Sequence, residues 1–468
     1  MPRRRSHPLS RRELLASGAA ALAAAALPLH GCRRRRRPDV LFVAVDDLND
    51  WIGCLGGHPQ TRTPNLDGLA QRGMLFRNAH CPSPVCNPSR TSVLTGIPPW
   101  VHGVYGNGVS FRLVLPEVET LPQAFRRQGY RVLGGGKIFH ADDELDSWDD
   151  YHATAPMHAA AHRQGLSRRL DWGPLDIPLS QTHDGELSGW AARQWRERRQ
   201  ASSPLFLAVG FTGPHLPWLV PRAIFDSFPA DGVALPPTRP DDLDDVPAGG
   251  WHLSKYPSDL HSQVLQSGVW HQAVAAYLAS IHAFDAALAG LLEAVAEGDP
   301  GNTVVVLWSD HGFHLGEKRH WRKWTLWEES TRVPLIVVAP AVARPGGVCD
   351  RPVRLADLFA TLAELCELPP PQVPEGASSF AHLLRDPQSG DPRPAVTSLR
   401  KDLAVRSEGW RYIRYWDGSE ELYDHVRDPL EWYNLAGRPE SAAVKAELAP
   451  WLPSAPRDVS LEGEQIED

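Results

Sequence analysis

Short apolar runs separated by helical segments constrain the fold of this chain more than any other feature. The chain has four runs that are rich in β-branched and other apolar residues and suit buried strands: Val40–Val45, Leu205–Val209, Thr303–Leu307 and Leu335–Val338. Helix-like segments lie between them, at Asn65–Gln71, Pro122–Gln128 and Ala273–Glu297. Strands that alternate with helices predict an α/β fold, with a large, mainly parallel or mixed sheet sandwiched by helices.

The chain changes character after the triple proline at Pro369–Pro371. Three short strand-like segments separated by turns follow it, at Leu403–Arg406, Arg411–Tyr415 and Glu421–Tyr423. They predict a small antiparallel sheet. We therefore predict a main domain over residues 39–370 and a C-terminal subdomain over residues 371–468. Two stretches with little periodicity, about 141–200 and 229–262, are expected to be long surface excursions.

The first 38 residues differ from the rest of the chain in charge and hydropathy. They hold ten arginines and one acidic residue, which leaves 38 basic and 55 acidic residues and a formal charge of −17 for the remainder, against −8 for the whole. So acidic a body excludes a general nucleic-acid binder. Arg11-Arg12 precede an Ala- and Leu-rich run, Leu14–Leu29, that is short and weak for a membrane span. This pattern resembles a twin-arginine export signal and predicts an exported, periplasmic or cell-surface protein that uses that export machinery.

Cys32 follows Leu29-His30-Gly31, and the four residues resemble a lipoprotein processing site that would leave the cysteine acylated. A cleaved leader with an incidental cysteine explains the same residues equally well, and the sequence leaves both open. Contact with a membrane is therefore expected only through such a lipid anchor.

Four other cysteines could pair in an exported protein: Cys54, Cys81, Cys349 and Cys366. Cys349 and Cys366 are the plausible pair. The sequence favours the absence of disulfides.

Polar clusters follow the ends of the predicted strands. Asp46-Asp47 and Asp310-His311 come directly after two of them, and His215 lies in the turn after a third. Ligands bind beyond the carboxyl ends of the strands in open α/β sheets. Three carboxylates and an imidazole that converge there would suit a hard cation such as calcium. Each pair alone is more often a turn or cap, but two pairs at two core strands favour a metal site.

The segment Cys86-Asn87-Pro88-Ser89-Arg90, followed by Thr91–Gly96, is the most specific motif of the chain. Pro88 suits the first turn of a helix with Cys86 or Asn87 at its cap. The Cys86 side chain would then lie where free N–H groups and the helix dipole favour an anion, with Arg90 one turn further on.

These residues resemble the type I sulfatases of the alkaline phosphatase superfamily, whose Cys-x-Pro-Ser-Arg signature directs oxidation of the cysteine to formylglycine. The resemblance extends over most of residues 39–435. It implies calcium ligands at Asp46, Asp47, Asp310, His311 and the modified Cys86, and a formylglycine-generating enzyme as a maturation partner. The matching segments are Thr63–Asp67, Gly136-Lys137, Asp310–Gly312, Glu421–Asp424, Asp428-Pro429 and Asn434-Leu435.

Within this family the chain looks most like the iduronate-2-sulfatases, which implies a sulfated uronic acid-containing carbohydrate as substrate. The Asp-His metal pair is one reason, since many arylsulfatases have Asp-Asn there. Ile97 departs from the family, which often has arginine after Thr-Gly. The other matching segments are Gly136–His140, Pro214-His215, Leu315–Glu317 and Trp321–Lys323.

The resemblance also implies a mechanism. Formylglycine at residue 86 hydrates to a geminal diol, and one hydroxyl, polarised by calcium, attacks the sulfur. His215 or Lys323 assists the leaving alcohol, and His140 is the base that releases sulfate from the second hydroxyl. Arg90, Lys137 and Lys323 neutralise the sulfate oxygens.

Several of these residues have plainer interpretations. Lys137 after three glycines could be a solvated lysine, and His140 one of many incidental histidines. The spacing of Trp321, Trp324 and Trp327 more often means packing than sugar recognition. A phosphodiester or phosphonate monoester hydrolase of the same superfamily, or an inactive sulfatase-like surface binding protein, are the alternatives. The intact Cys86 motif and metal set argue against the inactive protein, and the Asp-His pair favours the sulfatase.

Overall fold

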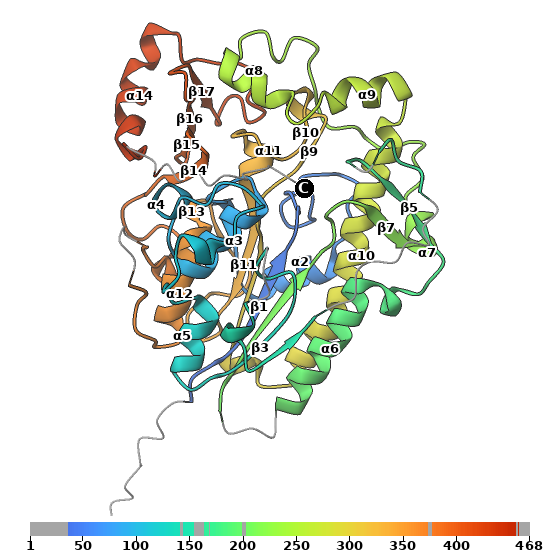
Figure 1. Ribbon diagram of the computed structural model, residues 1–468, viewed down its shortest axis with the longest axis vertical. Helices are drawn as coiled ribbons and strands as arrows, with labels where there is room; N and C mark the ends of the chain where they lie inside the picture. The colour runs from blue at the N-terminus through green and yellow to red at the C-terminus, as the bar shows by residue number, and fades with distance from the viewer. Residues whose placement is uncertain are drawn as a thin grey trace, which may run out of the picture. The chain divides into compact units, whose positions relative to one another are not determined.

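The computed structural model describes residues 36–140, 144–153, 163–167, 169–198, 203–372, 377–454 and 457, and residues 38–468 form one compact unit. The proposed export signal and Cys32 lie outside the described residues. A nine-stranded sheet forms the centre of this unit (Figure 1). Its strands run in the order β12 (Gly347–Cys349), β2 (Met74–His80), β11 (Arg332–Val338), β8 (Thr303–Ser309), β1 (Asp39–Val45), β6 (Leu205–Phe211), β3 (Arg131–Gly136) and β4 (Asp150–His152), and β13 (Val353–Arg354) pairs with β2.

The sheet is mixed rather than wholly parallel. β1 runs parallel to β6 and β8, whereas β11 is antiparallel to both β2 and β8. All seven residues of β1 are buried, and alternate side chains enter opposite cores, with Leu41 and Val43 on one face and Phe42 and Ala44 on the other. Burial on both faces explains the continuous apolar run in the sequence.

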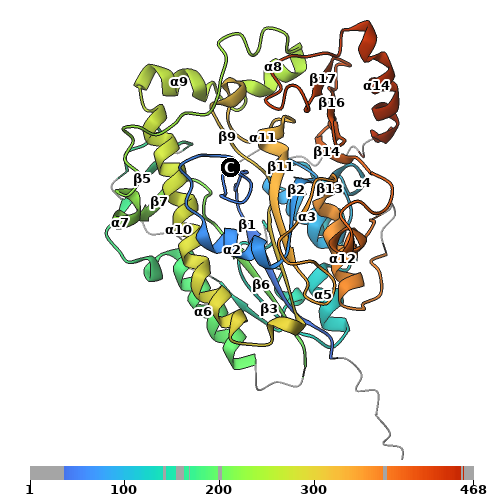
Figure 2. The ribbon, with the colours of Figure 1, turned by 180° about the vertical axis from the view of Figure 1, so that it is seen from behind.

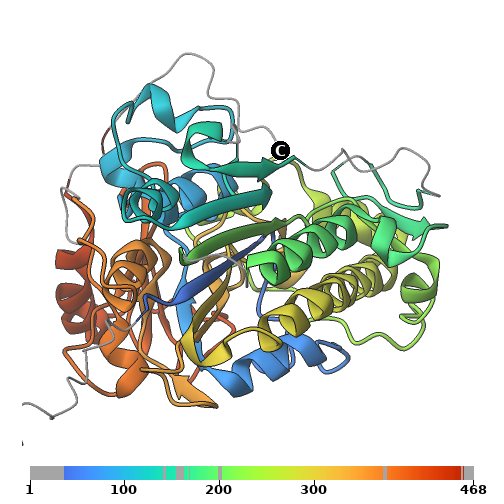
Figure 3. The same ribbon diagram turned by 90° about the horizontal axis from the view of Figure 1, so that it is seen from below.

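Helices cover both faces of the sheet, as Figure 3 shows from below. One core contains α2 (Pro64–Arg72), α6 (His183–Glu197) and α10 (Trp270–Ala296), and the other contains α3 (Cys86–Thr95), α5 (Leu121–Arg127) and α12 (Leu358–Leu365). Among the described helices, α10 is long and apolar enough to cross a membrane, but 78% of its apolar window is buried inside the protein. This burial is what a core helix requires.

A four-stranded antiparallel sheet follows the main sheet in the chain, in the order β14 (Ala395–Leu399), β15 (Asp402–Arg406), β16 (Trp410–Arg414) and β17 (Glu420–Asp424). Figure 2 shows it beside the last helix, α14 (Ala442–Leu448). Two further two-stranded sheets pair β5 (Trp172–Leu175) with β7 (Trp218–Pro221), and β9 (His314–Leu315) with β10 (Trp321–Arg322). The remaining short helices are α4 (Pro99–His102), α7 (Arg222–Phe225), α8 (Ala248–Ser254), α9 (Leu260–Ser267), α11 (Glu328–Thr331) and α13 (Ala381–Arg385).

The structure confirms the predicted α/β class and its antiparallel C-terminal sheet, and corrects two details. β2 escaped detection because Arg77 and Asn78 interrupt its apolar run, and β14 was also missed. The stretch 141–200 is not wholly a surface excursion, because α6 buries Leu187, Trp190 and Trp195 in the core. The five cysteines that the structure describes form no disulfide, so the Cys349–Cys366 pair is not made.

Candidate active site

Two polar pairs meet at the carboxyl ends of β1 and β8. The two strands are parallel neighbours with Val45 opposite Ser309, so the residues that follow them emerge side by side. The backbone N–H of Asp47 donates to Asp310 Oδ1 at 3.2 Å. Ligand atoms of Asp46, Asp310 and His311 lie within 4.8 Å of one another and of Cys86 Sγ. The sheet register thus brings Asp46, Asp310 and His311 together, and the start of α3 adds Cys86 as the fourth proposed metal ligand.

Cys86 is the first residue of α3, with Val85 as its cap, one residue earlier than the sequence indicates. Its Sγ lies 3.2 Å from His311 Nε2 and accepts a hydrogen bond from Lys323 Nζ at 3.1 Å. Burial opposes ionisation, but Lys137 and Lys323 outweigh it and hold the pKa of the Cys86 thiol well below its usual value. The helix N-terminus and these lysines therefore make residue 86 a position that favours negative charge.

Arg90 is fully buried and directed at carboxylates. Its Nε donates to Asp310 Oδ2 at 2.8 Å, and its Nη2 donates to Asp46 Oδ1 at 3.3 Å. Its Nη1 donates to the carbonyl oxygens of Lys137 and Ile138. The guanidinium therefore contacts the proposed metal ligands and the backbone, which differs from the expectation that Arg90 neutralises sulfate oxygens. Arg90 therefore fixes and charge-balances the carboxylates.

Two lysines flank the same cluster from different loops. Lys137 Nζ donates to Asp46 Oδ2 at 2.6 Å, and Lys323 Nζ donates to Asp47 Oδ1 at 2.8 Å. Burial opposes their charge, but Asp46 in the first case and Asp47 in the second outweigh it and raise the pKa of each lysine. Burial likewise opposes ionisation of Asp46, yet Lys137 outweighs it and lowers the pKa of that carboxyl. The cations therefore stay charged in the buried site.

His215 and His140 stand at the edge of the site and are only partly buried. His215 Nε2 lies 3.9 Å from Asp47 Oδ2. Burial lowers the pKa of His140, and a hydrogen bond with Cys86 partly offsets this effect. Lys137 completes the edge, with 21% of its side chain exposed against 20% for His215. Lys137, His140 and His215 are therefore the partly exposed groups beside the buried carboxylates.

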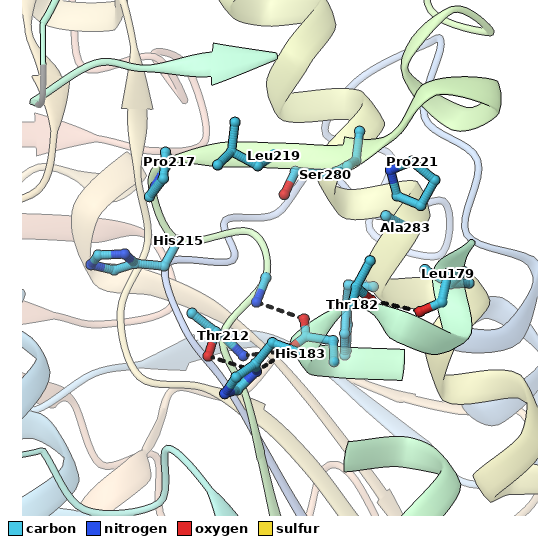
Figure 4. Close-up of a pocket in the computed structure, with 14 residues that line it drawn as sticks. Leu179, Thr182, His183, Thr212, His215, Pro217, Leu219, Pro221, Ser280 and Ala283 are labelled. Carbon is cyan, nitrogen blue, oxygen red and sulfur yellow. Dashed lines mark hydrogen bonds and ion pairs between the residues drawn. The ribbon is translucent and has the colours of Figure 1, made fainter. Parts of the chain in front are cut away.

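The loop that carries His215 is held by the beginning of α6. Asp184 accepts hydrogen bonds from the backbone N–H groups of Thr212 at 2.9 Å and Gly213 at 2.8 Å. Figure 4 shows His215 directed away from the small pocket beside this loop, whereas Thr212 and His183 face each other within it. The pocket measures about 40 Å³, which suits a water molecule rather than a sugar. The loop that presents His215 is therefore held by the hydrogen bonds to Asp184.

The residues present fit a hard cation. Asp47 Oδ2 is buried and makes no hydrogen bond. Ligand atoms of Asp47, Cys86 and His215 lie within 4.8 Å of one another, and Asp47 Oδ1 lies 3.3 Å from the Nε2 of His311 in the neighbouring group. Burial raises the pKa of Asp310 to about 7 against the pull of Arg90. A divalent cation would stabilise the ionised form of these buried, neighbouring carboxylates. An oxygen-rich set with one imidazole suits calcium.

Three positioning residues were missed by the sequence analysis. Tyr277 on α10 donates its hydroxyl to the Asp47 carbonyl at 2.8 Å, Ser309 accepts from the Leu48 N–H at 3.0 Å, and Ser89 donates to the Asp310 carbonyl at 2.6 Å. Ser89 and Ser309 sit next to recognised motifs and could have been suspected on that basis. Tyr277 lies in a helix with no local signal for this contact.

The tryptophans near Lys323 belong to the core. Trp321, Trp324 and Trp327 are each 1% exposed, which agrees with packing and excludes the interpretation that they stack on a sugar. Arg322 is also buried. The loop therefore contributes Lys323 to the site and uses its aromatic residues for support.

The fold and the site together define a hydrolase of the alkaline phosphatase-like superfamily. The sulfatase family model matches residues 38–368, and the model of the N-sulphoglucosamine sulphohydrolase C-terminal region matches residues 316–456. The chain belongs to the sulfatase family and is a sulfuric ester hydrolase.

Known proteins resemble the chain over most of its length. A sulfatase of Formosa agariphila is 33% identical over 428 residues, covering 86% of this chain and 83% of that protein. Iduronate 2-sulfatase of Mus musculus is 30% identical over 523 residues, covering 88% and 93% respectively.

Solved structures show the same fold. A phosphonate monoester hydrolase from Silicibacter pomeroyi has a TM-score of 0.75 at 21% identity and covers 88% of this chain and 94% of its own. A 2-O GAG sulfatase has a TM-score of 0.68 at 21% identity and covers 88% and 90% respectively. These likenesses confirm the predicted fold class.

Proposed function

We propose that this sulfatase hydrolyses a sulfate ester on a uronic acid-containing polysaccharide or oligosaccharide, using a formylglycine made from Cys86 and a calcium ion. The observation that carries the proposal is the position of Cys86 Sγ, which Lys323 Nζ and His311 Nε2 contact beside three carboxylates. The likeness to iduronate 2-sulfatase supports the uronate.

The catalytic groups would come from two sources. Asp46, Asp47, Asp310 and His311 would hold the calcium ion together with residue 86, and the ion would supply charge that favours an ionised hydroxyl. Formylglycine at residue 86 would supply, once hydrated, the attacking hydroxyl and a second one for release of sulfate.

The other residues would bind the anion and move protons. Lys137 and Lys323 would hold the non-bridging sulfate oxygens, where the ester keeps its charge. His215 Nε2, at the exposed edge, would donate a proton to the leaving alcohol, a role that Lys323 could share. His140 would accept a proton when sulfate is released. Arg90 would keep Asp46 and Asp310 in place throughout.

The same proposal covers maturation and location. An arginine pair before the Ala- and Leu-rich run supports export through the twin-arginine machinery to the periplasm or cell surface, with a lipid anchor if Cys32 is acylated. Cys86 would meet a formylglycine-generating enzyme. Radiolabelled palmitate on Cys32, absent from a Cys32→Ser variant, tests the anchor.

Mass spectrometry of the Cys86 peptide, after co-expression with a formylglycine-generating enzyme, tests the chemistry. We expect the aldehyde in place of the thiol, and release of sulfate from a 2-O-sulfated uronate disaccharide. The Cys86→Ala variant should lose this activity by about 10⁴-fold or more. Full activity of an unmodified thiol would refute the proposal.

The alternative within the superfamily is hydrolysis of phosphodiesters or phosphonate monoesters, since the fold is shared with such an enzyme. A substrate panel with phenyl phosphonate monoester and a sulfated disaccharide distinguishes them. We expect kcat/KM to favour the sulfate ester. An inactive binding protein would turn over neither substrate even with formylglycine present.

A further inference from the structure

The loop that delivers Lys323 has an unusual backbone. Four non-glycine residues near its turn have positive φ: Lys318 at 52°, Arg319 at 48°, Arg322 at 79° and Trp324 at 72°. Side chains with a Cβ disfavour this left-handed region. Such a conformation persists only where surrounding contacts impose it. The placement of Lys323 therefore depends on whatever holds the loop from outside.

His320 holds the loop through a direct contact with the backbone of Lys323. Its Nε2 lies 2.7 Å from the carbonyl oxygen of Lys323, and its Nδ1 lies 2.9 Å from the carbonyl oxygen of Ser254. Ser254 is the last residue of α8, and both His320 and Ser254 are 2% exposed. The imidazole thus bridges the Lys323 backbone to a helix outside the loop.

The chemistry of this bridge depends on protonation. Carbonyl oxygens only accept hydrogen bonds, and a neutral imidazole has one N–H, so both bonds form together only in the imidazolium. Burial lowers the pKa of His320, the two carbonyls raise it, and Arg322 and Lys255 lower it further. The ring of His314 packs edge-on at 5.1 Å, and His261 also lies within electrostatic range. A carboxylate also faces this group of side chains: Asp259 pairs with Lys255 at 3.1 Å and raises the pKa of His261.

We propose that His320 is a positioning residue for Lys323: the doubly protonated ring ties the Lys323 carbonyl to the end of α8 and so fixes Lys323 Nζ beside Cys86 and Asp47. In the neutral ring one of the two bonds is lost, and the lysine is held less firmly. The inference rests on the sulfate-binding role proposed for Lys323. Both hydrogen bonds are present at acid pH, and one is lost as the pH rises through the pKa of His320, which burial lowers.

Binding of inorganic sulfate to the full chain, with calcium present, tests the proposal by calorimetry between pH 4.5 and 7.5. His320→Gln keeps one donor and cannot titrate. The sulfate affinity of this variant should therefore not show the decrease that deprotonation of His320 causes in the wild type as the pH rises. His320→Ala should weaken sulfate binding by about tenfold at the acid end of this range, since small displacements of a binding group have effects of this size or more. His252→Gln, an exposed histidine on α8, is the matched control and should behave as the wild type.

A Lys323→Met variant distinguishes the sulfate-binding role of Lys323 from the positioning role of His320. If it weakens sulfate binding while both His320 variants match the wild type at every pH, the positioning role is overturned and the function of Lys323 stands. If Lys323→Met binds sulfate normally, the proposed role of Lys323 fails, and the positioning role fails with it. Should His320→Ala not fold, the pH profile of His320→Gln decides alone.

Discussion

Two buried ionic clusters can be compared in this molecule: the active site, and a junction network of Glu328, Arg406, Arg411, His425 and Glu431 between α11 and the C-terminal sheet. Both gather carboxylates, cations and an imidazole, and both bring three metal-ligating side chains within 4.8 Å. Glu328, Arg406 and His425 of the junction network also line a cavity of about 760 Å³.

The two clusters differ in whether every carboxylate oxygen has a hydrogen-bonding partner. Each junction carboxylate has an arginine partner: Glu328 pairs with Arg406 at 3.1 Å, and Glu431 pairs with Arg411 at 2.6 Å. In the active site Asp47 keeps one buried oxygen without a hydrogen bond. The active-site carboxylates also have cationic partners, so the oxygen of Asp47 that makes no hydrogen bond is what sets the active site apart. A buried ionic cluster is therefore structural when every carboxylate oxygen has a hydrogen-bonding partner. It becomes a candidate metal site when acceptors are left over.

Among the experiments that distinguish the two clusters, removal of metal should have the largest effect. A chelator followed by dialysis is expected to lower activity by roughly 10³-fold, because the ion supplies several kcal/mol of charge stabilisation, and calcium should restore it. Calorimetry should find one calcium per chain, in the wild type and in a Glu431→Gln variant alike. If the wild type binds a second calcium ion that the Glu431→Gln variant does not, the junction network is also a metal site and its structural role is refuted.

The Glu328→Gln substitution should mainly affect stability. It leaves Arg406 without its charged partner and removes one of the two partners of Arg411, which keeps Glu431, so we expect the free energy of unfolding to fall by about 3–5 kcal/mol. Turnover of the folded protein should change less than twofold. Glu420→Gln is the matched control, since its partly exposed pair with Lys445 is worth under about 1 kcal/mol. Equal losses in both variants would show that burial of the network contributes nothing.

Acid should weaken the junction network. Burial opposes ionisation of Glu328, but Arg406, His425 and Arg411 outweigh it and hold its pKa well below the usual value. A depressed carboxyl pKa gives stability that is present above the unfolded value of about 4.3 and is lost as the pH falls through the folded value. Denaturant unfolding should therefore show the gap between wild type and Glu328→Gln narrowing below about pH 4. A constant gap would contradict the pairing.

Tyr277→Phe should give the smallest effect. It removes the hydroxyl that contacts the Asp47 carbonyl and the Asn49 N–H, at a cost of about 1–3 kcal/mol for the unsatisfied groups. Because Asp47 is a proposed metal ligand, calcium affinity should also fall. Tyr412→Phe, which loses a bond to Glu420 on the small sheet, should leave calcium affinity unchanged. A normal calcium affinity in Tyr277→Phe would exclude a positioning role.

The sequence predicted the structure correctly where residues that are neighbours in the chain determine it. β1 and β8 appeared as continuous apolar runs because both of their faces are buried, and the polar pairs that end them were recognised at once. The direction of Arg90 could not be read in this way. Its partners, Asp46 and Asp310, lie 44 and 220 residues away.

The sequence by itself determined the fold class, the cysteine motif at the start of a helix, and the residue types of a hard-cation site. These properties follow from short-range periodicity, capping and side-chain chemistry. Only the tertiary structure decided that Arg90 serves the carboxylates, that the tryptophans near Lys323 are core, and that His320 spans two carbonyls. The reason is physical: each depends on distances between segments far apart in the chain, which the register of the sheet and the packing of loops set.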